Sequence, residues 1–183
     1  MRIPHFTRGT PYTEHLTRPG GWRLHGFHTR HAGNRIGFDY IHTAVDDHSR
    51  VAYAEVLPDE KGITAAGFLL RAAAWFAEHG VTIKEVLSDN HRSYTASRHF
   101  AEAVAVLGVT HRTIKAYCPW QNGKVERFHR TLATGWAYAQ PYTSNDQRTQ
   151  ALPAWLNDYN LERKHYGIGG QTPISRLHPS TTC

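Results

Sequence analysis

Glu126 is the residue whose surroundings most directly suggest chemistry. It is the only acid in the stretch from Arg112 to Arg130, which carries five Lys and Arg residues together with the aromatic residues Tyr117 and Trp120. A carboxylate among cations suits a hard divalent metal ion held beside a polyanion such as nucleic acid. The equally weighted alternative is an exposed Glu that pairs with neighbouring Lys and Arg side chains along a helix.

Asp89 is the second candidate metal ligand. It directly follows a short strand predicted over residues 84–88, and ligands of open α/β sheets bind at the carboxyl ends of strands. An isolated Asp in a Ser-Asp-Asn sequence more often forms a turn or caps a helix. Metal ligation and turn formation therefore both stay open for Asp89.

The elements that position these residues begin near residue 37. β-branched and aromatic residues predict strands over 38–45 and 50–57, joined by a turn at residues 46–49 in which Asp and Ser side chains bond to backbone amides. A further short strand is predicted over 109–114. A hairpin followed by alternating helices and strands predicts an α/β (α+β mixed) domain, with a mixed sheet covered by helices on its faces.

Four helices are predicted from apolar spacing and end signals. They cover residues 64–79, 97–107, 124–139 and 144–159. Thr64 is expected to cap the first, Ser97 the second, and a Ser144–Gln147 capping box the last. Because Pro153 cannot sit in a helix interior, we expect a break or restart there.

Composition favours one compact domain with an anionic partner. The 183 residues are 40% hydrophobic and carry a formal net charge of +6, which favours nucleic acid first and an acidic membrane surface second. Cys118 and Cys183 are too few for a disulfide framework or a cysteine zinc site. The longest apolar run, 63–77, is too short to cross a bilayer. We expect the reducing cytoplasm as the compartment and no membrane as partner. A His25-His28-His31 series favours exposed polar side chains over a metal cluster.

Several motifs together resemble one protein family. They are Leu87-Ser88-Asp89-Asn90 with Tyr94, then Tyr117-x-Pro119-x-Gln121-Asn122-Gly123-Lys124-x-Glu126-Arg127, the hairpin turn Val45 to Arg50, and Asn160-x-x-Arg163-x-His165 with Thr172-Pro173. This set is similar to the retroviral-integrase-like core (Asp-Asp-Glu) of bacterial insertion-sequence transposases. The resemblance covers roughly residues 37–178.

The resemblance implies a ribonuclease-H-like fold with a mixed five-stranded sheet flanked by helices. It implies that Asp89 and Glu126 are catalytic and hold Mg²⁺ or Mn²⁺, two ions in the intact family, for phosphodiester cleavage and strand transfer in DNA transposition or integration. It also implies DNA as partner, both transposon ends and target, and assembly with further copies of the chain. The expected nucleic-acid-binding residues are Lys115, Gln121, Asn122, Lys124, Arg127 and Arg130, against the alternative of a merely solubilising basic face.

The chain departs from the family at the first catalytic Asp. The family places it on the strand before the hairpin, where the only acid upstream of Asp39 is Glu14, so no residue is assigned to this position. The expected organisation is an irregular lead-in over 1–36 with a remnant of the first strand, an integrase-like core over 37–178, and a tail over 179–183. We expect a fragment that is truncated at its N-terminus or disrupted in its reading frame, with impaired catalysis. A catalytically inactive DNA-binding remnant or regulator, and a ribonuclease-H-like nuclease, are the alternatives.

Two neighbouring residues raise separate questions. His91 stands where the family usually has Gly, which tolerates positive φ angles. We expect simple tolerance of His91, with an altered turn or a reach toward the metals as alternatives. Trp120 either stacks on a DNA base or closes its loop against the core.

Overall fold

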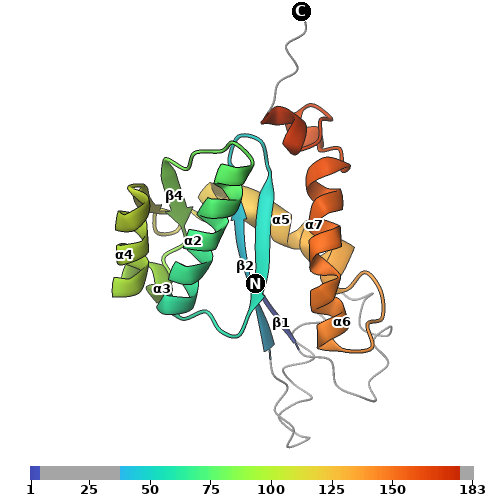
Figure 1. The fold of residues 1–183 in the computed structure, drawn as a ribbon, viewed down its shortest axis with the longest axis horizontal. Helices are drawn as coiled ribbons and strands as arrows, with labels where there is room; N and C mark the ends of the chain where they lie inside the picture. Colours follow the sequence, from blue (N-terminus) through green and yellow to red (C-terminus); the bar gives the residue numbers. More distant parts are fainter. Residues whose placement is uncertain (5–37, 178–183) are drawn as a thin grey trace, which may run out of the picture.

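The computed structural model describes residues 1–4 and 38–177, and its strands form two sheets (Figure 1). The first is antiparallel and has the order β1 (Arg2–Pro4), β2 (Phe38–Val45), β3 (Ala52–Leu57). In the second, β4 (Glu85–Ser88) and β5 (Thr110–Thr113) pair in parallel. The expected single five-stranded sheet is therefore wrong for the described residues: the five strands are divided between two sheets, because no strand of the described part of the chain joins β2 to β4.

The turn between β2 and β3 is made by side chains, as predicted. One carboxylate oxygen of Asp46 accepts bonds from the backbone N–H and the hydroxyl of Ser49, each at 2.6 Å. Ser49 is fully buried and its hydroxyl accepts from the N–H of Val51 at 3.1 Å. These bonds hold Arg50 at a φ of 71° and return the chain into β3.

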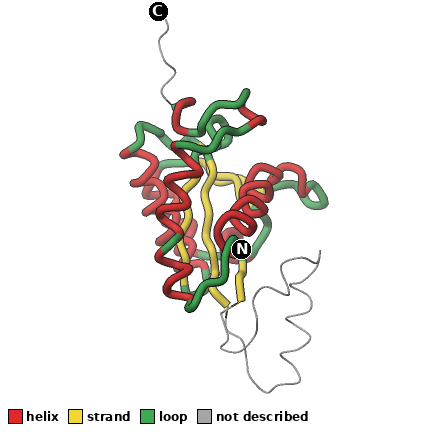
Figure 2. The backbone as a smooth tube through the Cα atoms, turned by 90° about the vertical axis from the view of Figure 1, so that its right-hand side faces the viewer, coloured by secondary structure: helices red, strands yellow, loops and turns green. Residues whose placement is uncertain are grey.

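Helices cover both sides of the strands (Figure 2). One group consists of α2 (Gly62–Glu78), α3 (Arg92–Thr95) and α4 (Arg98–Leu107). The other consists of α5 (Gly123–Leu132), the π-helix Ala133–Ala137, α6 (Asn145–Gln150) and α7 (Leu152–Leu161). Two short 3₁₀ helices follow, Tyr166–Ile168 and Ile174–Arg176. None of the described helices is both long and apolar enough to cross a membrane.

Local end signals set most helix limits. Ser97 accepts from the N–H of Phe100 at 3.2 Å, and Gly108 ends α4 with a φ of 65°, both as predicted. Ser144 caps α6, and the chain restarts as α7 with Pro153 in its first turn. The cap predicted at Thr64 is wrong. The helix begins two residues earlier, and the Thr64 hydroxyl donates to Asp59 at 2.6 Å instead.

The core consists of two apolar clusters, one for each helix group. Packing between β2, β3, α5 and α7 buries residues that include Ile41, Phe128, Leu132, Trp136 and Tyr159. Packing between α2 and α4 buries Ala65, Leu69, Phe100 and Ala103. Each cluster fixes one helix that borders the candidate site, α5 in the first case and α2 in the second.

One buried amide joins α7 to the outer edge of β3. Asn160 accepts from the backbone N–H of Ala52 at 2.9 Å and donates to its carbonyl at 2.8 Å. Asn160 belongs to the carboxyl-terminal motif of the family resemblance, and its structural role is to satisfy backbone groups that β2 does not reach. The predicted lead-in beyond Pro4, the His25, His28 and His31 series, Glu14 and Cys183 lie outside the described residues.

Candidate functional site

Asp89 stands at the carboxyl end of β4, as the sequence predicts, and its carboxylate is exposed. One of its oxygens accepts from the backbone N–H of His91 at 2.9 Å. His91 has a φ of −64° and caps α3, so this position does not require glycine. Tolerance of His91 is thereby explained. Asp89 acts as a turn former and still presents a carboxylate to solvent.

The neighbours of Asp89 hold its loop on β5. The hydroxyl of Ser88 lies 2.9 Å from Nε2 of His111, and the side-chain amide of Asn90 donates to the carbonyl of Ile114 at 2.9 Å. Burial lowers the pKa of His111, whose ring also packs edge-on against Phe100 of α4. Strand β5 thus fixes the direction in which the Asp89 loop leaves the sheet.

Glu126 lies in the first turn of α5 and is also exposed. The opposite side of this helix is anchored by Phe128 and Leu132, which are buried in the core. The ring of His129 adds a polar anchor, because its Nε2 lies 2.7 Å from the hydroxyl of Thr43 on β2. Burial is the main cause that lowers the pKa of His129 to about 4, and the nearby N-terminal ammonium group adds to this effect. His129 is therefore neutral at pH 7.

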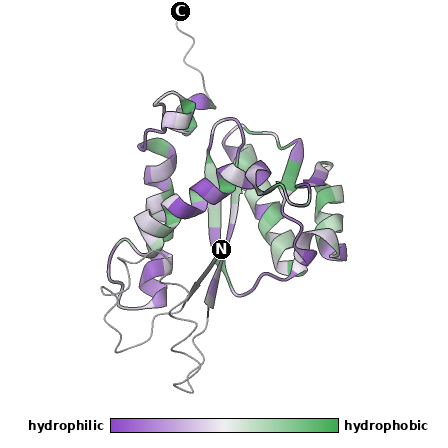
Figure 3. Cartoon of the chain, turned by 180° about the vertical axis from the view of Figure 1, so that it is seen from behind, coloured by the Kyte–Doolittle hydropathy of each residue, from purple (hydrophilic) through white to green (hydrophobic). Residues whose placement is uncertain are grey.

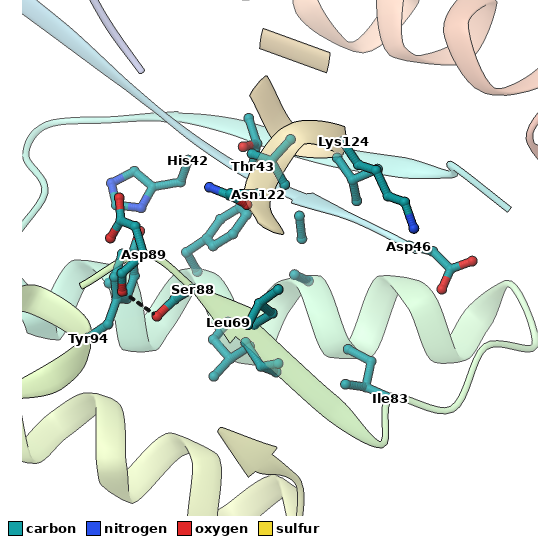
Figure 4. A pocket seen from close by; sticks show the side chains of 18 of the residues that line it. His42, Thr43, Asp46, Leu69, Ile83, Ser88, Asp89, Tyr94, Asn122 and Lys124 are labelled. Carbon is teal, nitrogen blue, oxygen red and sulfur yellow. Dashed lines mark hydrogen bonds between the residues drawn. The ribbon is translucent and has the colours of Figure 1, made fainter. Parts of the chain in front are cut away.

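A cavity of about 770 Å³ connects the two regions (Figure 4). Asp89 lines it directly after β4, and Asn122, Lys124 and His129 line it from the segment that contains α5. Glu126 is not part of this lining, but it is one helical turn from both Asn122 and His129, which places it beside the rim.

The carboxylates of Asp89 and Glu126 are donors of the type that a divalent metal ion prefers, but they are few. Carboxylate oxygens are the ligands that Mg²⁺ and Mn²⁺ prefer. Among the described side chains, however, no group of three or more His, Cys, Asp or Glu is placed to hold a metal ion. Asp46 and Asp47 do not extend the pair to a trio, since Asp46 bonds to Ser49 and Asp47 pairs with Lys124.

The residues expected to contact nucleic acid differ in their freedom to do so. The side chains of Lys115, Arg127 and Arg130 are exposed. Lys124 is engaged with Asp47, and the side-chain oxygen of Gln121 accepts from the backbone N–H of Lys115 at 2.8 Å. Arg127 and Arg130 belong to α5, and Figure 3 shows that much of this helix is hydrophilic.

Two exposed aromatic residues precede α5. Trp120 is 71% exposed and Tyr117 is 97% exposed, with a φ of 60°. Trp120 therefore does not close its loop against the core, and base stacking stays as the prediction for it. Sequence reasoning did not single out Tyr117 or His129 as site residues. For His129, its place three residues after Glu126 was an available signal.

Comparison with known proteins places the chain in a family. Residues 17–119 match a family model described as integrase core domain, and residues 107–173 match a second model with the same description. The chain is 32% identical over 133 residues to the Gag-Pol polyprotein of bovine immunodeficiency virus (strain R29). That match covers 73% of this chain and 8% of the polyprotein, so the chain corresponds to a small part of this relative.

Solved structures show the same fold. The catalytic core domain of BIV integrase matches with a TM-score of 0.56 and 28% identity, over 75% of this chain and 84% of that one. A simian T-cell lymphotropic virus intasome in complex with PP2A regulatory subunit B56 gamma matches with a TM-score of 0.64 and 26% identity. It covers 80% of this chain and 51% of that one. The predicted ribonuclease-H-like fold class is thus confirmed. The chain belongs to the integrase core domain family, within the retroviral-integrase-like superfamily.

Proposed function

We propose that this chain is the DNA-binding catalytic-core part of a transposase or integrase. One arrangement carries the proposal: Asp89 directly follows β4 at a cavity bordered by α5, the helix that bears Glu126, Arg127 and Arg130. DNA phosphates would lie on the exposed cations of this helix, which brings a phosphodiester toward the carboxylates. The core would extend over residues 37–178.

Asp89 and Glu126 are the proposed catalytic metal ligands. Mg²⁺ or Mn²⁺, when bound, would activate the attacking oxygen and stabilise the leaving one in an in-line displacement at phosphorus. In this chain the β5 contacts of Ser88 and Asn90 orient the Asp89 loop, and the Thr43–His129 contact orients the helix of Glu126. Because His129 is neutral, it adds no positive charge that would repel a metal ion there.

A second function is favoured by the number of carboxylates. The described residues supply two candidate ligands and no third, which disfavours tight binding of two metal ions. The second candidate is therefore a catalytically inactive DNA-binding module that regulates an intact transposase through mixed assembly. The transposon ends and target DNA would be partners in both cases, as would further copies of the chain.

DNA binding is tested by fluorescence anisotropy of a labelled duplex at several salt concentrations. We expect the logarithm of affinity to fall linearly with the logarithm of salt concentration. The triple Ala variant of Lys115, Arg127 and Arg130 should lower the slope by about 0.9 for each phosphate that is no longer neutralised. The matched control removes three exposed cations elsewhere, Lys61, Arg98 and Lys164. Equal reductions in both variants would contradict the proposed surface.

Catalysis is tested separately, by strand transfer with Mn²⁺ on DNA carrying matched end sequences. Product formation that is abolished by Asp89→Asn and by Glu126→Gln supports the catalytic function. DNA binding with no product supports the regulatory one. Activity that survives both substitutions would overturn the assignment of these carboxylates.

A further inference from the structure

The segment that follows α7 brings a second group of cations to the turn between β2 and β3. After α7 ends at Leu161, the chain continues through Arg163 and His165 into the two short 3₁₀ helices. This segment lies at the same end of the strands as the turn (Figure 1), and Nη2 of Arg176 lies 3.3 Å from Nε2 of His48. The proposed function assigns no role to Arg163 or His165.

The packing of α7 brings Arg50 close to His165. The amide of Asn160 joins the last turn of α7 to the backbone of Ala52, which lies two residues after Arg50. The ring of His165 packs edge-on against Tyr159, the neighbour of Asn160, with ring centroids 4.7 Å apart. The turn that carries Arg50 and the loop that carries His165 therefore meet at the carboxyl end of α7.

Two guanidinium groups act on the rings at this end of α7. Burial is the main cause that lowers the pKa of His165, and the positive charges of Arg163 and Arg50 lower it further. Burial raises the pKa of Tyr159 to about 12, and the same two charges oppose this rise. Both guanidinium groups therefore lie within electrostatic reach of the His165 ring.

Two buried nitrogen atoms of this group have no hydrogen-bond partner among the described residues. They are Nη1 of Arg50 and Nε2 of His165. Neither Arg50 nor Arg163 forms an ion pair within the described part of the chain, although Asp158 and Glu162 lie near in sequence and are exposed. A buried cationic donor without an acceptor costs free energy, and a bound anion would remove this cost.

The types of donor indicate which anion fits. A guanidinium group donates in a planar fork that matches the oxygens of phosphate and carboxylate groups. An imidazole can donate from Nε2 in its neutral and in its protonated form. The two permanent positive charges of Arg50 and Arg163 match a dianion such as a phosphate monoester better than a carboxylate, which carries one negative charge.

We propose that Arg50, Arg163 and His165 form a binding site for a dianionic phosphate group, either a free phosphate ion or a phosphate monoester. Because Arg163 is exposed and the other two residues are half-buried, the site lies near the surface. The site goes beyond the proposed function, because it includes neither α5 nor the candidate metal ligands.

The test is isothermal calorimetry of the full chain at pH 8, with inorganic phosphate and methyl phosphate as probes. We expect saturable binding of inorganic phosphate. Saturable binding of methyl phosphate as well would extend the site to monoesters, whereas binding of inorganic phosphate alone would restrict it to the free ion. Dimethyl phosphate and acetate, which carry one negative charge, should bind weaker by about tenfold or more.

Substitutions assign the binding to these residues. Arg50→Gln and Arg163→Gln should each weaken phosphate binding by about tenfold or more, because each removes a charge-assisted hydrogen bond. Lys164→Gln, which removes an exposed cation from the same segment, is the matched control and should change the affinity by less than about twofold. Without phosphate, the urea midpoint of Arg50→Gln should equal or exceed that of the wild type, because a buried unpaired charge is removed.

Four results would overturn the proposal. They are the absence of saturable phosphate binding, equal affinities for phosphate and dimethyl phosphate, equal weakening by Lys164→Gln, and a lower urea midpoint of Arg50→Gln without phosphate. Arg163→Gln changes an exposed side chain, so it tests the site even if Arg50→Gln does not fold. No part of the test uses DNA or a metal ion, so its result is independent of the proposed function.

Discussion

His129 links the candidate site to the sheet at the scale of a single residue. Its ring contacts the hydroxyl of Thr43 and lies on the same helix as Glu126. Burial is the main reason that its pKa falls to about 4, and the Met1 ammonium group adds to the effect. Burial also lowers the pKa of His42, which lines the same cavity. Both rings are therefore uncharged at neutral pH.

We predict that acid destabilises the protein through His129. The folded-state pKa of about 4 lies below the ordinary value of 6.5, so the unfolded chain binds more protons between these values and stability falls as pH falls through this window. The expected decrease between pH 7 and pH 5 is about 2 kcal/mol from this group. Urea unfolding at pH 7 and at pH 5 measures this decrease in stability. His129→Gln, which does not titrate, should be destabilised less by acid than the wild type, and an equal decrease would refute the assignment.

The segment from α5 through the π-helix Ala133–Ala137 is the element that joins the site to the core. Trp136 in the π-helix is buried, and its indole N–H donates to the carbonyl of Arg148 at 2.8 Å. A methyl group on Gly135 would lie 2.7 Å from Nε1 of Trp155 on α7. Close packing against α7 therefore requires glycine at this position.

We predict different effects on stability for two Gly→Ala substitutions in this segment. Gly135→Ala should lower the free energy of unfolding by about 1–3 kcal/mol, because the added methyl group overpacks the contact with Trp155. Gly123→Ala meets no atom within 4 Å and has a φ of −58°. It should leave stability unchanged or raise it by about 0.5–1 kcal/mol. Urea titration measures the free energy of unfolding of both variants. Similar changes in the two variants would argue against the close contact between Gly135 and Trp155.

At the scale of the whole molecule, the two candidate ligands come from separate helix groups. Asp89 precedes α3, on the side of α2 and α4, and Glu126 lies on α5, which packs with α7. The distance between them therefore depends on how β4 is placed relative to β2. The described residues include no strand that fixes this placement.

We predict weak divalent-metal binding in the isolated chain. Two exposed carboxylates should bind Mn²⁺ with a dissociation constant on the order of 1 mM, as expected for a site with few charged ligands. Isothermal calorimetry should show that the binding heat disappears in Asp89→Asn and in Glu126→Gln. Asp146→Asn, which removes an exposed acid from α6, is the matched control. Equal binding by all variants would show that the two carboxylates do not act together.

The sequence by itself determined the elements whose ends depend on neighbouring residues. Ser97 and Gly108 delimit α4, and the Asp46–Ser49 bonds form the hairpin turn, because each partner lies within a few residues. The placement of Arg127 and Arg130 on one helix was equally readable, since they lie three residues apart within α5. The Thr64 cap failed because the Thr64 hydroxyl donates to Asp59 instead, and the sequence pattern did not show which of the two interactions would form.

Only the tertiary structure decided which distant groups meet. His129 bonds to a residue 86 positions away, and Asn160 to one 108 positions away, distances over which no local pattern carries information. The division into two sheets was also decided by the tertiary structure, since strand pairing depends on which backbone edges lie next to each other. The motifs around Asp89 and Glu126 could be recognised from sequence. The cavity between β2 and β4 could not be recognised in this way, because it is formed by elements that are far apart in the sequence.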